Sequence, residues 1–113
     1  MASVSNISNV IYKELGTTEI SLVELDANQK GACVGFSLAN LKSSTVKASV
    51  FVTNGDGVKG YYVKDLQIAA NSSARIINGG EKLLLGPNNA VSVVCDLPSA
   101  LDVIFSLVVI TYT

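Results

Sequence analysis

The sequence predicts an all-β protein, an antiparallel β-sandwich of jelly-roll-like type with about eight or nine short strands and no substantial helix. Turn signals rich in Gly, Asn, Asp and Pro recur roughly every eight to twelve residues, a spacing typical of sandwiches. β-Branched residues dominate between these turns, and no segment keeps the 3.6-residue period of an amphipathic helix. The 113 residues are expected to form one domain (1–113), because that length falls in the commonest size range for a single core.

Strands in the first half of the chain are predicted from apolar alternation between turns: Ile7–Lys13, Thr18–Leu25, Ala32–Asn40 and Thr45–Asn54. Gly16 separates the first two, and the polar run DANQKG precedes the third. Alternation in the third strand places these side chains on one face: Ala32, Val34, Phe36 and Leu38. The same reasoning for the fourth strand points these residues inward: Val46, Ala48, Val50 and Val52.

Strands in the second half are predicted in the same way: Lys59–Ala69 (as one strand or two short ones), Ala74–Asn78, Lys82–Leu85, Ala90–Leu97 and Leu101–Thr113. The segment Asn54-Gly55-Asp56-Gly57 is a strong turn signal ahead of them, because these residue types tolerate the positive φ of tight hairpins. Pro87 and Pro98 both fall in turns, where a missing N–H breaks no bond between strands.

The final strand differs from the others because both of its faces are largely apolar from Ile104 onward. One face carries Leu101, Val103, Phe105, Leu107, Val109 and Thr111. The other carries Asp102, Ile104, Ser106, Val108, Ile110 and Tyr112. An antiparallel strand normally leaves one face to solvent, so a second apolar face needs a cover of its own. Another protein or another copy is the favoured cover, while a second layer of the same sandwich stays open as the alternative.

Composition argues against several classes of partner. Only 15% of the residues are charged, against about 25% in an average protein, and the net charge is −1 without a like-charge run. Neither nucleic acid nor a membrane is therefore expected as a partner. No secretory signal is visible, and no apolar run approaches the ~20 residues that span a bilayer. The chain is thus expected to be made in a cytoplasm.

Reactive groups are scarce, and we predict that the protein is not an enzyme. The chain has no histidine, which rules out a Cys–His nucleophile pair and histidine metal ligands. Cys33 and Cys95 lie in apolar strands and are interpreted as buried reduced thiols, although their spacing leaves a disulfide open. Tyr61 and Tyr62 should point to opposite faces, one into the core and one to the surface. No catalytic residue, cofactor or metal is expected.

Several segments within residues 18–113 occur in an order found in a known group of proteins: Leu38-Ala39-Asn40 with Ser43-Ser44, Val46–Val52, Tyr61-Tyr62-Val63-Lys64-Asp65, Gly79-Gly80-Glu81-Lys82-Leu83 and Leu101-Asp102-Val103. In this pattern of strand and turn residues the chain resembles the small virion structural proteins of tailed bacteriophages. It departs from them at Pro87-Asn88-Asn89, where the family often has an acidic residue preceded by glycine.

This resemblance implies a non-enzymatic β-sandwich located in the virion and made in the cytoplasm of a bacterial host. A capsid decoration (cement) protein, which clamps neighbouring capsid subunits, is the favoured role. Its partners would be the major capsid protein or other virion proteins, and it would form a homo-oligomer, with a trimer among the allowed states. A neck or tail component and a small lectin-like, carbohydrate-binding module are the alternatives.

Interface residues are predicted from the second apolar face and from the N-terminal segment 1–12, which is expected to act as an assembly arm. On the last strand they are Ile104, Val108, Ile110 and Tyr112. On the arm they are Val10 and Tyr12. Contacts of this kind gain strength when they are repeated many times around a symmetric lattice.

Overall fold

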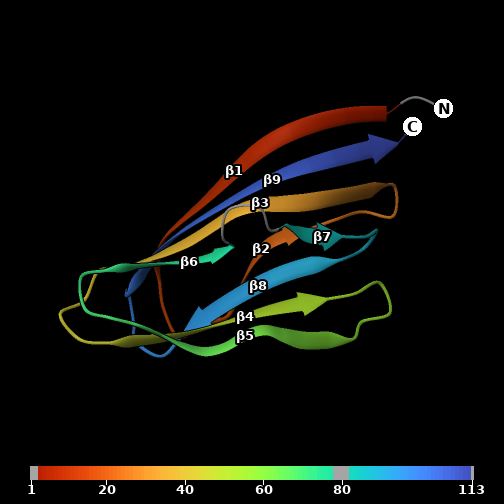
Figure 1. The fold of residues 1–113 in the computed structure, drawn as a ribbon. Coiled ribbons are helices and arrows are strands. Elements are labelled where there is room, and N and C mark those ends of the chain that lie inside the picture. Colours follow the sequence, from red (N-terminus) through yellow and green to blue (C-terminus); the bar gives the residue numbers. More distant parts are fainter. Residues whose placement is uncertain (1–2, 78–81, 113) are drawn as a thin grey trace.

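The computed structural model describes residues 3–77 and 82–112, and these form nine strands in two antiparallel sheets (Figure 1). The predicted all-β sandwich is therefore confirmed. Residues 78–81, the first two residues of the expected arm, and Thr113 at the end of the last predicted strand lie outside the described residues. Within the described ranges, no helix is long and apolar enough to cross a membrane.

Sheet A contains the longest strands and has the order β1-β9-β3-β6, with β7 also pairing with β3. Its strands are β1 (Ser3–Leu15), β3 (Gln29–Asn40), β6 (Ser73–Ile77), β7 (Leu83–Leu85) and β9 (Leu101–Tyr112). β6 pairs with the second half of β3 and β7 with its first half, so both lie along the same side of β3. β1 therefore forms one edge of the sheet, and β6 with β7 forms the other.

Sheet B is smaller and has the order β2-β8-β4-β5. Its strands are β2 (Ile20–Glu24), β4 (Val46–Thr53), β5 (Lys59–Ile68) and β8 (Ala90–Cys95). The predicted Asn54 turn joins β4 to β5: Asn54 Oδ1 accepts hydrogen bonds from the N–H groups of Asp56 and Val58. Gly57 has φ of 79°, the positive value that the turn chemistry requires.

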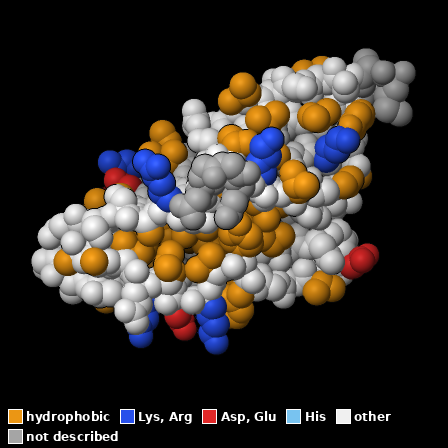
Figure 2. All heavy atoms as spheres, viewed as in Figure 1, with side chains coloured by type: hydrophobic (Ala, Val, Ile, Leu, Met, Phe, Trp, Pro, Cys, Tyr) orange, Lys and Arg blue, Asp and Glu red, His pale blue; other side chains and the backbone are white. Residues whose placement is uncertain are grey.

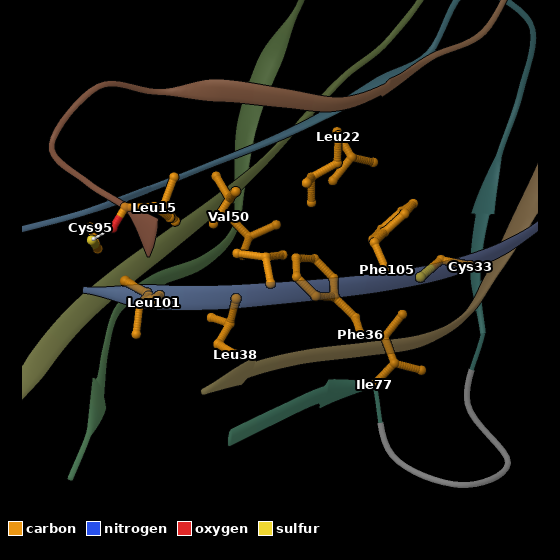
Figure 3. Close-up of a cluster of buried hydrophobic side chains, with 14 of the residues drawn as sticks. Leu15, Leu22, Cys33, Phe36, Leu38, Val50, Ile77, Cys95, Leu101 and Phe105 are labelled. Atoms are coloured by element: carbon orange, nitrogen blue, oxygen red, sulfur yellow. Dashed lines mark hydrogen bonds between the residues drawn. The ribbon is translucent and has the colours of Figure 1, made fainter. Parts of the chain in front are cut away.

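The core fills the space between the two sheets and is made by alternate residues of their strands. β9 contributes Val103, Phe105 and Leu107, while β4 and β8 contribute Val50 and Val93 from the facing sheet. Figure 3 shows Phe36 and Phe105 side by side, and their rings meet edge to face with centroids 5.0 Å apart. Fully burying a side chain of this size stabilises the fold by about 1.5–3 kcal/mol.

A β-bulge in β3 changes the faces that simple alternation predicts. The register with β9 shifts between Cys33 and Gly35, so Cys33 and Phe36 both point into the core. The prediction that Ala32 and Val34 share the face of Phe36 is wrong, because the extra residue rotates the first half of the strand. Val34 is exposed as a result.

Asn40 ties one end of sheet A to sheet B through a buried amide. Its Nδ2 donates to the carbonyl oxygens of Ser44, Ile68 and Ala69 at 2.9, 3.0 and 3.1 Å. Its Oδ1 accepts from the N–H of Lys42 at 2.8 Å. A buried amide with all of these partners holds the end of β3 against the end of β5.

The molecule is elongated, measuring 51 × 26 × 22 Å. In Figure 1, β1 and β9 diverge from sheet B towards the end of the molecule where Ser3 pairs with Tyr112. The pairing of β1 with β9 runs from Ser3 opposite Tyr112 to Leu15 opposite Leu101. Residues 3–12 of the expected arm are thus part of strand β1. This strand is longer than the predicted strand Ile7–Lys13.

Candidate functional site: the outer face of sheet A

The outer face of sheet A, defined as the face turned away from sheet B, carries a row of aliphatic side chains. Leu84 of β7 is opposite Ala32 of β3, Ala32 is opposite Val108 of β9, and Val108 is opposite Ile7 of β1. Residues directly opposite each other in antiparallel strands share a face. We call these four residues the apolar row. Its two ends are strongly exposed, Ile7 at 83% and Leu84 at 74%.

Polar and apolar pairs flank the apolar row along β9. Ile104 lies opposite Ile11, and both side chains are exposed. Between this pair and the row, Ser106 Oγ donates to Asn9 Oδ1 at 2.7 Å. Towards the chain ends, the Lys30 ammonium lies 5.2 Å from the centre of the Tyr112 ring. The outer face is therefore mostly uncharged, with Lys30 stacked against an aromatic ring.

Two shallow hollows lie along this face. One is lined by Lys30, Gly31, Ala32, Leu84, Leu85, Val108 and Ile110, and it is mainly apolar. The other is lined by Val34, Gly35, Phe36, Ser37, Arg75, Ile77, Ile104 and Ser106. In the side view of Figure 2 the broadest hydrophobic area lies between the two sheets, and smaller hydrophobic groups are scattered over the upper part, where β1, β9 and β3 lie. Neither of these two linings contains a carboxylate or an exposed aromatic ring, the pair that a sugar-binding groove would need.

The structure brings four of the six predicted interface residues together. Ile104, Val108, Ile110 and Tyr112 lie on the outer face of sheet A, where they are half-buried or exposed. In the described part of the chain, sheet B packs instead against the opposite face of β9, through Val103, Phe105 and Leu107. The second sheet therefore covers only one of the two apolar faces of this strand.

The other two predicted interface residues lie apart from these four. Val10 pairs with Phe105 and Tyr12 with Val103, which places both on the inner face of β1. Val10 is half-buried against the core, and Tyr12 is exposed. Ile7 and Ile11 lie in the segment 1–12 that is expected to make contacts, although neither is named as an interface residue. Leu84 on β7 lies outside the prediction. These three are the most exposed aliphatic residues of the outer face. In the predicted strand Ile7–Lys13, Ile7 and Ile11 are four residues apart and therefore point to the same face. That spacing could have identified them as a pair on the outer face.

The two cysteines lie in surroundings that disfavour the reactive thiolate form. Both are free and buried, and Figure 3 shows them at opposite ends of the core cluster. Burial raises the pKa of Cys33 to about 11 and also raises the pKa of Cys95. Their thiols donate to the backbone carbonyls of Gly35 and Leu15, both at 3.3 Å. They remain protonated thiols, as expected of small buried hydrophobic groups.

Sheet B has a polar outer face centred on Glu19. The Lys59 ammonium bonds to both oxygens of that carboxylate, at 2.6 and 2.8 Å, and Ser92 Oγ donates to it at 2.9 Å. The hydrogen bond from Lys59 is the main reason that the pKa of Glu19 is lowered. Tyr61 and Tyr62 are both exposed, so the prediction that one is buried is wrong. The register shifts in β5 break the strict alternation between these two neighbours.

Among the described residues, no group of three or more His, Cys, Asp or Glu is placed to hold a metal ion. Asp102 instead has a structural role at the start of β9. One of its oxygens accepts from the N–H of Glu14 at 3.1 Å, and the other lies 3.9 Å from the Lys13 ammonium. Asp102 thus links the start of β9 to the end of β1.

No protein-family model and no curated protein matches the sequence. Solved structures with the same fold include one from work on disulfide-linked pili of Bacillus endospore appendages. Its TM-score is 0.58 at 10% identity, over 98% of this chain and 89% of that one. A chain from the acid-stable capsid of Helicobacter pylori bacteriophage KHP30 has a TM-score of 0.54 at 16% identity, over 95% and 90%. A chain from T=1 particles derived from infectious bursal virus scores 0.53 at 12% identity, over 97% of this chain but 32% of that one. At these identities the likeness shows the β-sandwich fold.

Proposed function

We propose that this protein is a structural subunit of a virion, specifically a decoration protein that binds the outside of a phage capsid through the outer face of sheet A. The observation that carries the proposal is the apolar row, with Ile7 and Leu84 exposed at its ends. Contiguous exposed aliphatic surface on a small protein marks a binding face. The capsid chains among the structures with the same fold support this choice of assembly.

The contact would work by burying aliphatic area rather than by pairing charge. Each Å² of apolar surface removed from water contributes about 25 cal/mol. The apolar row consists of four side chains, so each copy would bind with modest affinity. Repetition around a lattice would multiply the strength of binding. The long, rigid strands β9 and β3 hold the row in place, since they form the centre of sheet A. No catalytic step is needed for such a role.

A neck or tail component is the second candidate. One observation favours it: the similarity in fold to the chain from the endospore-appendage work, which extends over nearly all of both chains. The same outer face would then bind other subunits along a tube or fibre. Electron microscopy of labelled virions separates the two, because decoration places copies over the head and the alternative places them at the neck or along the tail.

The binding test uses particles assembled without this protein, sedimented with the purified chain. Leu84→Asp places a charge at the exposed end of the apolar row, and we expect binding to weaken about tenfold or more. Val58→Asp is the matched control, because Val58 is also an exposed aliphatic residue but lies beside the β4–β5 turn of sheet B. Failure of the unmodified chain to bind particles would reject the proposal. Equal binding by the Leu84→Asp variant would reject the assigned face.

A further inference from the structure

The two sheets have four edges, and β1 is the one edge that lacks protection against pairing with another strand. Edge strands normally carry charges, prolines, bulges or short lengths that discourage such pairing. Over Ser3–Tyr12, β1 has no charged residue and no proline. Its register with β9 is regular from Ser3 to Tyr12 and shifts only beyond Tyr12. Nearly every side chain in this stretch is exposed.

Each of the other edges carries protective features. The β5 edge contains Lys59, Lys64 and Asp65, and its pairing with β4 shifts register twice. The β2 edge has five residues, ends in Glu24 and has a register shift. The opposite edge of sheet A is divided between two short strands, β6 and β7. The contrast indicates that β1 alone is built to accept another strand.

We infer that β1 pairs antiparallel with β1 of a second copy, around a two-fold axis at Ile7, to form a dimer in which sheet A is continuous. A two-fold axis perpendicular to the sheet keeps each side chain on its own face, so every residue must face a residue of the same parity. Placing the axis at Ile7 meets this condition and sets Ile7 of one copy opposite Ile7 of the other.

Most facing pairs match in that register, and Ser3 opposite Ile11 is the unlike pair within residues 3–11. Ser5 faces Asn9, and Asn6 faces Ser8, so polar residues meet polar residues. Val4 faces Val10 on the inner side. In the register shifted by two residues, with the axis at Asn9, both Ile7 and Ile11 would face each other, but Val10 would face Ser8 and Tyr12 would face Asn6. Cross-strand pairs of like character stabilise a sheet by about 0.2–1 kcal/mol each, which favours the axis at Ile7.

Pairing at Ile7 also extends the candidate binding face. The apolar row ends at Ile7 on β1 and begins again at Ile7 of the second copy. The row would then run from Leu84 of one copy to Leu84 of the other without a charged residue in its path. This inference goes beyond the proposed function, because the dimer would form whether or not a capsid is the surface that the row binds.

The test changes Ile7, because in this register Ile7 of one copy lies opposite Ile7 of the other. Ile7→Lys and Ile7→Glu each place two like charges at the axis, so each variant alone should be monomeric, with a dissociation constant raised about tenfold or more. Mixing the two variants should restore a dimer, because a lysine then faces a glutamate. Ile7 is 83% exposed, so neither substitution should impair folding of the single chain. Sedimentation equilibrium over a concentration series measures these masses.

Leu84→Lys is the matched control, since it introduces the same charge on the same face but at the far edge of sheet A. It should remain dimeric even where capsid binding is lost, which separates failure of the dimer from failure of the proposed function. A monomeric unmodified chain at every concentration would overturn the inference. So would dimers that persist in Ile7→Lys, or a mixture of the two Ile7 variants that stays monomeric.

Discussion

The outer faces of the two sheets carry different kinds of side chain, although both belong to one antiparallel sandwich. On sheet B, Glu19 bonds to Lys59 and Ser92, and the Lys59 ammonium also lies 4.4 Å from the centre of the Phe51 ring. On sheet A, Ile7, Ile11, Ile104 and Leu84 are exposed. The polar groups of sheet B find partners within the chain. The aliphatic groups of sheet A do not find cover within the described residues.

The paired charged groups on sheet B have little to gain from a further partner, whereas the exposed aliphatic groups on sheet A favour association. Charged groups paired at a surface gain little from a further partner, because water and the neighbouring side chain already satisfy them. Exposed aliphatic groups gain free energy whenever water is removed from them. The contrast between the faces is the basis for our proposal that the outer face of sheet A binds a partner. Three comparisons of protein stability test this difference, from the largest expected effect to the smallest.

Adjacent residues of β9 should respond in opposite ways to the same charge. Val103 is 0% exposed in the core, so Val103→Asp should unfold the protein by burying an unpaired carboxylate, at a cost of several kcal/mol. Ile104 is 45% exposed on the outer face, so Ile104→Asp should change the free energy of unfolding by less than about 1 kcal/mol. Urea denaturation measures both. Comparable loss of stability in the two variants would show that the outer face is buried after all.

Asn40 should matter far more than an exposed asparagine, because its hydrogen bonds are buried. Asn40→Leu leaves the N–H of Lys42 and three carbonyl groups without their side-chain partner, and we expect a loss of about 2–4 kcal/mol. Asn9→Ala removes one exposed side-chain bond to Ser106 and should cost less than about 0.5 kcal/mol. Thermal unfolding monitored by circular dichroism compares the variants. Equal melting temperatures would contradict the assigned role of Asn40 in holding the two sheets together.

Glu19 should contribute the smallest and most pH-dependent effect. Its folded-state pKa lies below the ordinary value of 4.5, chiefly because of Lys59, so its contribution is complete above about pH 4.5. That contribution is lost as the pH falls through the lower folded-state pKa. Glu19→Gln should therefore destabilise the protein by about 0–1 kcal/mol at pH 7, since both partners are partly exposed. The stability curves of the two proteins should converge in acid. A constant difference across the pH range would exclude the ion pair as the cause.

The sequence predicted the fold class and most strands because apolar alternation and turn chemistry are local properties. It predicted the outer-face positions of Ile104 and Val108 for the same reason. The faces of Ala32 and Val34 could not be predicted, because a bulge depends on how β3 meets β9 across the sheet. Leu84 was missed because a run of three leucines has no alternation to show which side chain is exposed.

The pairing of β1 with β9 also determines when the apolar row can exist. Ser3 lies opposite Tyr112, so the edge ladder of sheet A, between β1 and β9, joins segments separated by nearly the whole sequence. Closing such a long loop makes folding slow, with all-β proteins of this kind folding in about milliseconds to seconds. On the ribosome, β1 must wait until β9 has emerged. The apolar row therefore forms only after β9 has paired with β1 and β3.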